Sequence, residues 1–91
     1  MHGSVAAKLT ICGDADDLYV DAKRQRIYVS CGDGNVDVIE PRKTGYARVA
    51  QLPTAAGART SLFVPELDRL FVAVRARSGV PATIWVFRPA P

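Results

Sequence analysis

The sequence predicts an all-β protein: residues 1–91 read as a single β-propeller segment of about two blades, each blade a four-stranded antiparallel sheet. Residues 17–29 have the pattern of a strand, a polar turn and a second strand, and residues 61–72 repeat that pattern. The copies align with an offset of 44 residues in the first strand and 43 in the second, so the second turn is expected to be one residue shorter. All-β repeats with a period in the low forties are typical of propeller blades.

The first strands follow from apolar runs and turn formers. Residues 5–11 have a composition compatible with an outer strand, which the turn formers at 13–17 bring to an end. The apolar run 18–20 predicts a strand packed on both faces. Residues 21–25 supply a polar turn, and a second strand is expected at 27–31.

Two more strands complete this blade. The Gly-Asp-Gly segment at 32–34 is a hairpin turn, because both residue types tolerate positive φ. Residues 35–39 alternate polar and apolar, which predicts a half-buried third strand, and residues 46–52 return as a fourth. Residues 17–52 therefore predict one full blade.

The second blade is predicted to lack its outer strand. Residues 59–87 contain the repeated strand pair, a longer loop at 75–81 and a third strand at 83–87. Segment 48–52 echoes the start of segment 5–11, so the latter is expected to be the outer strand of a preceding blade and to pair beside 83–87, in the same chain or in a neighbour. Stable propellers use roughly four to eight blades. The expected partners are therefore copies of the chain itself or missing blades of a longer chain.

Composition narrows the class of protein. With 48% hydrophobic and 23% charged residues, the chain resembles ordinary globular proteins rather than disordered ones. The net charge of +3 is spread along the chain, which favours a solvated surface over a nucleic-acid site. No apolar run is long enough for a membrane span, and the start lacks the features of a signal peptide, so the chain as written is expected in the cytoplasm.

The cysteines suggest packing rather than metal binding. Cys12 and Cys31 are the only two, no CxxC occurs, and His2 is the sole histidine, so a four-ligand metal site is excluded. Each cysteine stands at the end of an expected strand, where it serves as a small buried apolar side chain. The alternative is a disulfide bond in an oxidising compartment.

Three segments also carry a family resemblance. Residues 16–21, 26–34 and 57–74 resemble the final blades of bacterial YVTN/YncE-type β-propeller proteins, and Arg-Ile-Tyr-Val-Ser at 26–30 is typical of such repeats. The resemblance covers residues 5–87. It implies a seven-bladed, single-chain, exported protein in the periplasm or outside the cell. The present sequence differs from that pattern in having about two blades and no export signal.

The candidate functional residues are identified by the face of a propeller on which their loops are expected to emerge. No GxSxG, HExxH, P-loop or GxGxxG motif occurs, so no catalytic residue, cofactor or metal site is predicted. In a propeller, the loops entering each inner strand and those joining the second and third strands emerge on one face. The charged residues expected there are Asp14, Asp16, Asp17, Asp33, Arg59, Arg75 and Arg77. They can bind a small polar ligand or a partner loop, but salt bridges that hold adjacent blades in register are the favoured interpretation.

The sequence therefore favours a non-catalytic propeller module that acts as a binding or interaction scaffold. The alternative is a propeller enzyme, such as a lactonase-like hydrolase, in which acidic residues from several blades hold a metal over the central channel. The absence of catalytic motifs favours the first hypothesis.

Overall fold

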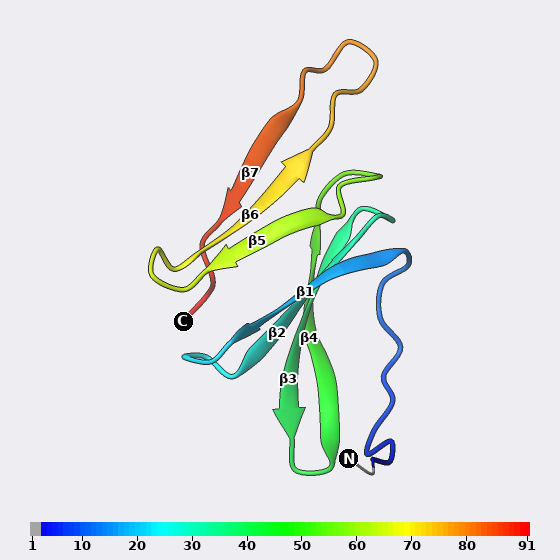
Figure 1. The fold of residues 1–91 in the computed structure, drawn as a ribbon, viewed down its shortest axis with the longest axis vertical. Helices are drawn as coiled ribbons and strands as arrows, with labels where there is room; N and C mark the ends of the chain where they lie inside the picture. Colours follow the sequence, from blue (N-terminus) through cyan, green and yellow to red (C-terminus); the bar gives the residue numbers. More distant parts are fainter. Residues whose placement is uncertain (1–2) are drawn as a thin grey trace.

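The computed structural model describes residues 3–91, so His2 lies outside the described residues. The strands are β1 (Ala15–Asp21), β2 (Arg26–Cys31), β3 (Asn35–Arg42), β4 (Gly45–Pro53), β5 (Thr60–Val64), β6 (Arg69–Val74) and β7 (Thr83–Phe87). They form two antiparallel sheets, β1-β2-β3-β4 (sheet A) and β5-β6-β7 (sheet B), drawn in Figure 1. The predicted all-β class is confirmed, and residues 3–91 do not close a ring. None of them forms a helix that is long and apolar enough to span a membrane.

The strand pair β5–β6 repeats the pair β1–β2 with an offset of 43 residues in both strands. Tyr19 lies opposite Tyr28 across β1 and β2, and Leu62 lies opposite Phe71 across β5 and β6. The expected difference of one turn residue is therefore wrong. Matching the letters of two apolar tripeptides ignores which way their side chains point, whereas a one-residue slip moves every side chain of a strand to the other face.

Both strand pairs close through turns of equal length. The pair Asp21–Arg26 closes the first turn and Val64–Arg69 closes the second, with four residues between the strands in each case. The residue just before the second strand is left-handed in both turns, with φ of 55° at Gln25 and 57° at Asp68. The same offset of 43 thus relates the turns as well as the strands.

The main core lies between the two sheets. We call the face that each sheet turns toward the other its inner face, and the opposite face its outer face. The buried inner-face side chains are Tyr28, Val36 and Val38 on sheet A and Phe63, Leu70, Val72 and Val74 on sheet B. The rings of Tyr28 and Phe63 lie 5.2 Å apart. Burying each large apolar side chain contributes about 1.5–3 kcal/mol, so these residues set how the sheets stack.

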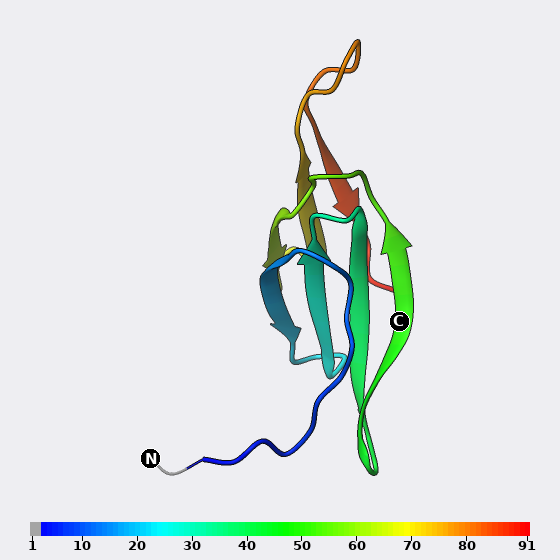
Figure 2. The ribbon, with the colours of Figure 1, turned by 90° about the vertical axis from the view of Figure 1, so that its right-hand side faces the viewer.

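Residues 5–11 form no strand, in contrast to the sequence-based expectation. This segment, the arm, crosses the outer face of sheet A, as Figure 2 shows. Leu9 and Ile11 lie there beside Ile27, Val29 and Ile39. A strand requires a hydrogen-bonded neighbour, and within residues 3–91 the arm has none, nor does it lie beside β7.

A disulfide anchors the end of the arm. Cys12 and Cys31 are bonded, with their Cα atoms 5.9 Å apart, so the interpretation of two separate buried thiols is wrong. The backbone N–H of Cys12 also donates to Asp37 Oδ2 at 2.8 Å. These contacts bring the arm to β2 and β3, a placement that depends on tertiary structure rather than on cysteine spacing.

Candidate functional site

Five of the seven predicted residues lie in loops, mainly where β1 and β5 begin, whereas Asp16 and Asp17 lie within β1 itself. The loops are the segments before β1, between β2 and β3, between β4 and β5, and between β6 and β7. The first three meet at this end of the two sheets, and the loop between β6 and β7 extends further out (Figure 1). The structure connects some of the predicted residues and leaves others apart.

Asp14 and Arg59 form an ion pair between the sheets. Arg59 Nη1 lies 2.8 Å from Asp14 Oδ2. The pair lies over Gly32, since a Cβ atom there would approach Asp14 Oδ2 to 2.0 Å and Arg59 Nη1 to 3.2 Å. Because Gly32 has no side chain, it leaves room for this ion pair, which we call a joint because it connects the two sheets. The Arg59 and Asp14 side chains are 46% and 60% exposed, so water screens the pair and it is worth at most about 1 kcal/mol.

Asp17 and Tyr19 connect β1 to β5. The Asp17 carboxylate accepts a hydrogen bond of 2.8 Å from the backbone N–H of Ser61. The Tyr19 hydroxyl donates to the backbone carbonyl of the same residue. Burial and the nearby Asp17 charge raise the pKa of Tyr19, which keeps the hydroxyl protonated as a donor. One residue of β5 is thus held through both of its backbone polar groups.

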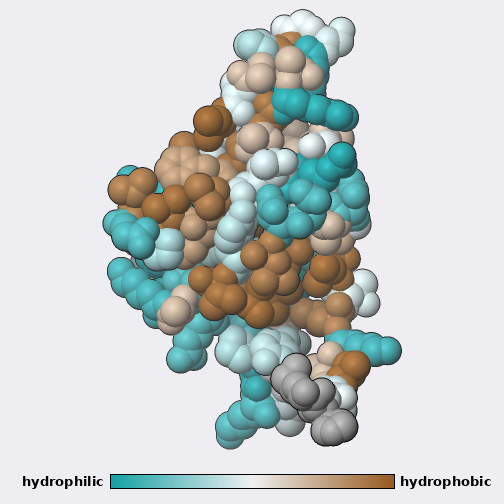
Figure 3. Space-filling view, viewed as in Figure 1, coloured by the Kyte–Doolittle hydropathy of each residue, from teal (hydrophilic) through white to brown (hydrophobic). Residues whose placement is uncertain are grey.

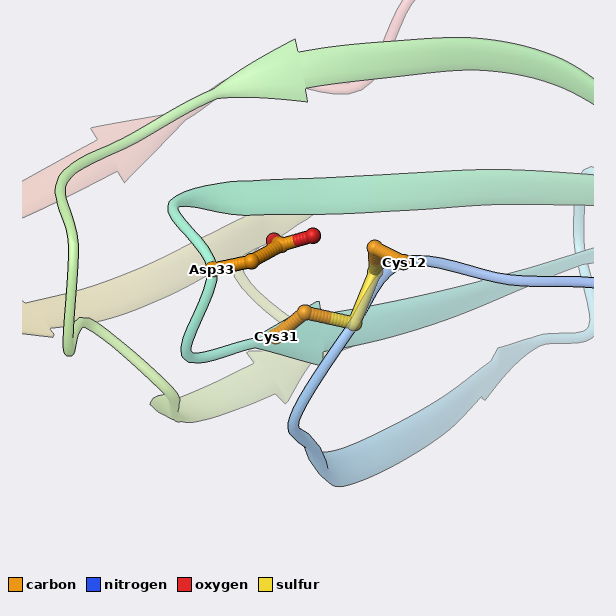
Figure 4. A group of neighbouring side chains, drawn as sticks. All are labelled: Cys12, Cys31 and Asp33. Carbon is orange, nitrogen blue, oxygen red and sulfur yellow. A yellow bond between two sulfur atoms is a disulfide. The ribbon is translucent and has the colours of Figure 1, made fainter.

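Asp33 connects the turn between β2 and β3 to Gly13, which lies between the arm and β1. Its Oδ2 accepts from the backbone N–H of Gly13 at 2.8 Å, and its Oδ1 accepts from the Asn35 amide at 3.2 Å. Figure 4 shows Asp33 beside Cys12 and Cys31. The two sulfur atoms are bonded to each other, so this group does not offer the thiolate ligands that a soft metal ion prefers.

Arg75 occupies the end of sheet B. Its guanidinium covers Gly57, where an added Cβ atom would meet it at 2.8 Å. Both residues line a hollow of about 490 Å³ on the outer face of the sheet, together with Thr60 and Ile84. The side chains of Asp16 and Arg77 make no hydrogen bond or ion pair with any residue between 3 and 91. The seven residues thus do not converge on one centre.

Sequence reasoning missed a second joint, at the opposite end of the sheets. Asp21 is only 2% exposed, and it accepts hydrogen bonds from the Tyr28 hydroxyl at 2.6 Å and from Arg24 Nη1 at 3.1 Å. Arg24 also binds Asp68 of sheet B through two hydrogen bonds of 2.6 Å. The sequence did contain a signal for this contact. Arg24 and Asp68 carry opposite charges in the two equivalent turns, but from the sequence alone these turns are identified only as polar segments.

The acidity of these groups follows from their contacts. Burial raises the pKa of Asp21, but hydrogen bonds from Tyr28 and Arg24 outweigh it and leave the pKa below its ordinary value. The two hydrogen bonds from Arg24 lower the pKa of Asp68. Burial, with the hydrogen bond to Asp21, raises the pKa of Tyr28 to about 12. All three groups keep the protonation state that the joint requires at neutral pH.

A second hollow lies at the edge of the core, near the C-terminal residues. It measures about 420 Å³ and lies between β4 and the residues that follow β7. Its walls are mainly apolar, among them Val38, Leu52 and Phe87. At its rim Arg26 Nε lies 2.9 Å from Glu40 Oε2.

The charged residues described above act as donors and acceptors within the fold. Three of the four predicted aspartates accept hydrogen bonds from protein groups, and Arg59 neutralises one of them. These contacts give the three carboxylates a structural role in joining the sheets and the turns. Comparison with protein-family models, curated proteins and solved structures gave no match for this chain.

Proposed function

We propose that this chain is a non-catalytic module of the β-propeller type, related to the YVTN/YncE repeats that it resembles, and that it serves as an interaction scaffold. The observation that carries the proposal is the exposed apolar surface of the sheets. Ile84 and Val86 on sheet B are 67% and 56% exposed, and Leu18 and Val20 on sheet A are 60% and 61% exposed. Figure 3 shows hydrophobic side chains gathered on the surface over the sheets. Contiguous exposed apolar surface of this kind marks interaction sites.

The loop contacts support a scaffold over the lactonase-like hydrolase. A metal-assisted hydrolase needs carboxylates that are free to bind the metal. Asp14 is paired with Arg59, and Asp17 and Asp33 accept backbone N–H groups. These contacts favour the interpretation in which the charged loops hold the sheets in register.

The disulfide supports an oxidising compartment as the place of action. Such bonds form and persist in the periplasm or outside the cell and are rare in the cytosol. The bond between Cys12 and Cys31 joins the end of the arm to sheet A. This agrees with the exported location that the family resemblance implies.

A turnover assay tests the non-catalytic proposal. The folded chain is incubated with Ca²⁺ or Zn²⁺ and a panel of lactones, and hydrolysis is followed by acid release. The matched variant is Asp14→Asn/Asp16→Asn, at two exposed positions, with a melting curve to confirm folding. We expect equal background rates for both proteins. A metal-dependent rate that the wild type shows and the variant lacks would establish the hydrolase instead.

A further inference from the structure

We propose that the outer face of sheet B binds sheet A of a second copy of this chain, in the same way that sheet B stacks on sheet A within one copy. The inference rests on the proposed scaffold function and names its partner. Three features carry it: the apolar side chains, the charges at the loop end, and the unpaired edge of β7.

The apolar side chains of the core recur on the exposed face. Because directly opposed residues share a face, the cross-strand pairs assign each side chain to its side of the sheet. The sheet A half of the core contains Tyr19, Tyr28, Val36 and Val38. Their structural counterparts on the outer face of sheet B are Leu62, Phe71, Ile84 and Val86. The first set is covered by sheet B, whereas the second set has no sheet over it within residues 3–91.

The complementary surface lies on sheet A. In the core, Phe63 of β5 packs on Tyr28. The counterpart of Phe63 in β1 is Val20, which is exposed on the outer face of sheet A. In the proposed contact, Val20 of the second copy packs on Phe71. Both partners of this contact are apolar.

The charges at the proposed contact are also complementary, but the acid and the base have exchanged sheets relative to the contact within one copy. Within one copy, Asp14 of sheet A meets Arg59 of sheet B over Gly32. The counterparts of Asp14 and Gly32 in sheet B are Gly57 and Arg75, so at the same place sheet B presents a guanidinium instead of a carboxylate. The counterpart of Arg59 in sheet A is Asp16, which is exposed. The second copy therefore brings an acid to Arg75.

The arm can supply a fourth strand to sheet B, which has three strands within residues 3–91. Sheet A has four strands, and β4 also contributes Leu52 to the contact with sheet B. The arm precedes β4 by the same 43 positions and lies against the outer face of its own sheet A. In the proposed contact it continues sheet B along the free edge of β7. The register between β3 and β4 predicts the register between β7 and the arm of the second copy. In sheet A, Val36 lies opposite Leu52 and Val38 lies opposite Ala50. The equivalent pairs are Ile84 with Leu9 and Val86 with Ala7 of the second copy.

This contact joins different surfaces of the two copies, so it repeats head to tail. Such heterologous contacts close into rings or extend into filaments, according to the rotation between copies. Each added copy covers one apolar face of sheet B and provides it with a fourth strand. The proposal thus accounts for the apolar face and the open edge together.

Sedimentation velocity over a range of concentrations tests the apolar part. We expect the wild type to associate and Ile84→Asp to remain a folded monomer, because this exposed position tolerates a charge in the single chain. The matched control is Val80→Asp, on the β6–β7 loop, which is longer than the equivalent β2–β3 turn of sheet A, and this variant should associate like the wild type. A wild type that stays monomeric, or an Ile84→Asp that associates equally well, overturns the proposal.

Charge exchange tests the pairing of Arg75 with Asp16. We expect Arg75→Glu to weaken association by about tenfold and Arg75→Glu/Asp16→Arg to restore it. The control Arg77→Glu, with the same change of charge on the same loop, should have little effect. Equal effects of Arg75→Glu and Arg77→Glu would contradict the pairing.

These results are separable from the test of the scaffold function. A monomeric wild type without metal-dependent turnover would overturn the second copy as the partner and leave the scaffold proposal standing. Metal-dependent turnover would overturn the scaffold proposal whatever the association state.

Discussion

At the scale of single residues, Asp21 shows how the fold accommodates a buried acid. An isolated carboxylate in a core is costly, and it is tolerated when hydrogen bonds and a cation compensate it. Tyr28 and Arg24 provide both, and Arg24 extends the contact to Asp68 of the other sheet. The network therefore links the interior of sheet A to a turn of sheet B.

Acid should weaken this network. The pKa values of Asp21 and Asp68 in the folded chain lie below the ordinary value of 3.8, so their stabilisation is present above that pH and is lost as pH falls through the folded values. We expect the free energy of unfolding, measured with urea at a series of pH values, to decrease below about pH 4. In Asp21→Asn this dependence should be smaller, whereas Asp16→Asn should keep it. An unchanged slope in Asp21→Asn would contradict the prediction.

The ion pair at the other end should contribute little. We expect Arg59→Ala to lower the free energy of unfolding by no more than about 1 kcal/mol, because both side chains are largely exposed. A screen of small polar ligands, with melting curves in parallel, should show no ligand whose binding depends on Arg59. Loss of a ligand without a change in melting temperature would mean that these loops form a binding site.

At the scale of elements, the arm depends on its disulfide. Residues 5–11 lack strand pairing within residues 3–91, so the covalent bond at Cys12 and the apolar side chains of Leu9 and Ile11 keep the arm on sheet A. The bond closes a loop between residues 19 positions apart. It restricts the unfolded chain and places the arm where the proposed second copy needs it.

Removal of the disulfide should be costly. We expect Cys12→Ala/Cys31→Ala to lose about 3 kcal/mol of stability in denaturant unfolding, in line with the entropy of a loop of this size. Reduction of the wild type should produce a similar loss, and the variant itself should be insensitive to reductant. Equal stability of the variant and the oxidised wild type would show that the apolar contacts hold the arm unaided.

At the scale of the whole molecule, two stacked sheets leave a large surface for their size. The chain extends 48 × 27 × 26 Å, and the outer face of sheet B carries several exposed apolar side chains. Small domains bury a low fraction of their surface and have little stability to spare. Association with further sheets is a direct way to cover that face.

Association makes stability depend on concentration. If copies bind only in the folded state, mass action raises the melting temperature as the protein concentration increases. We expect this dependence in calorimetry of the wild type and its absence in Ile84→Asp. A wild-type melting temperature that is constant over the concentration range would contradict the prediction.

The sequence by itself determined strands β1 to β7, because runs such as 18–20 and turn formers such as 32–34 act locally, but the strand expected at 5–11 has no hydrogen-bonded neighbour within residues 3–91. It also anticipated that Asp14 and Arg59 lie at the same end, since loop direction follows from strand order. Only the tertiary structure decided the true repeat offset, because cross-strand pairing assigns Tyr19 and Leu62 to equivalent faces.

The remaining contacts are also tertiary. The bond between Cys12 and Cys31, the salt bridge between Arg24 and Asp68, and the path of the arm each join segments that are distant in the sequence. No local pattern specifies such partners, because what brings them together is the stacking of one sheet on the other and of the arm on sheet A.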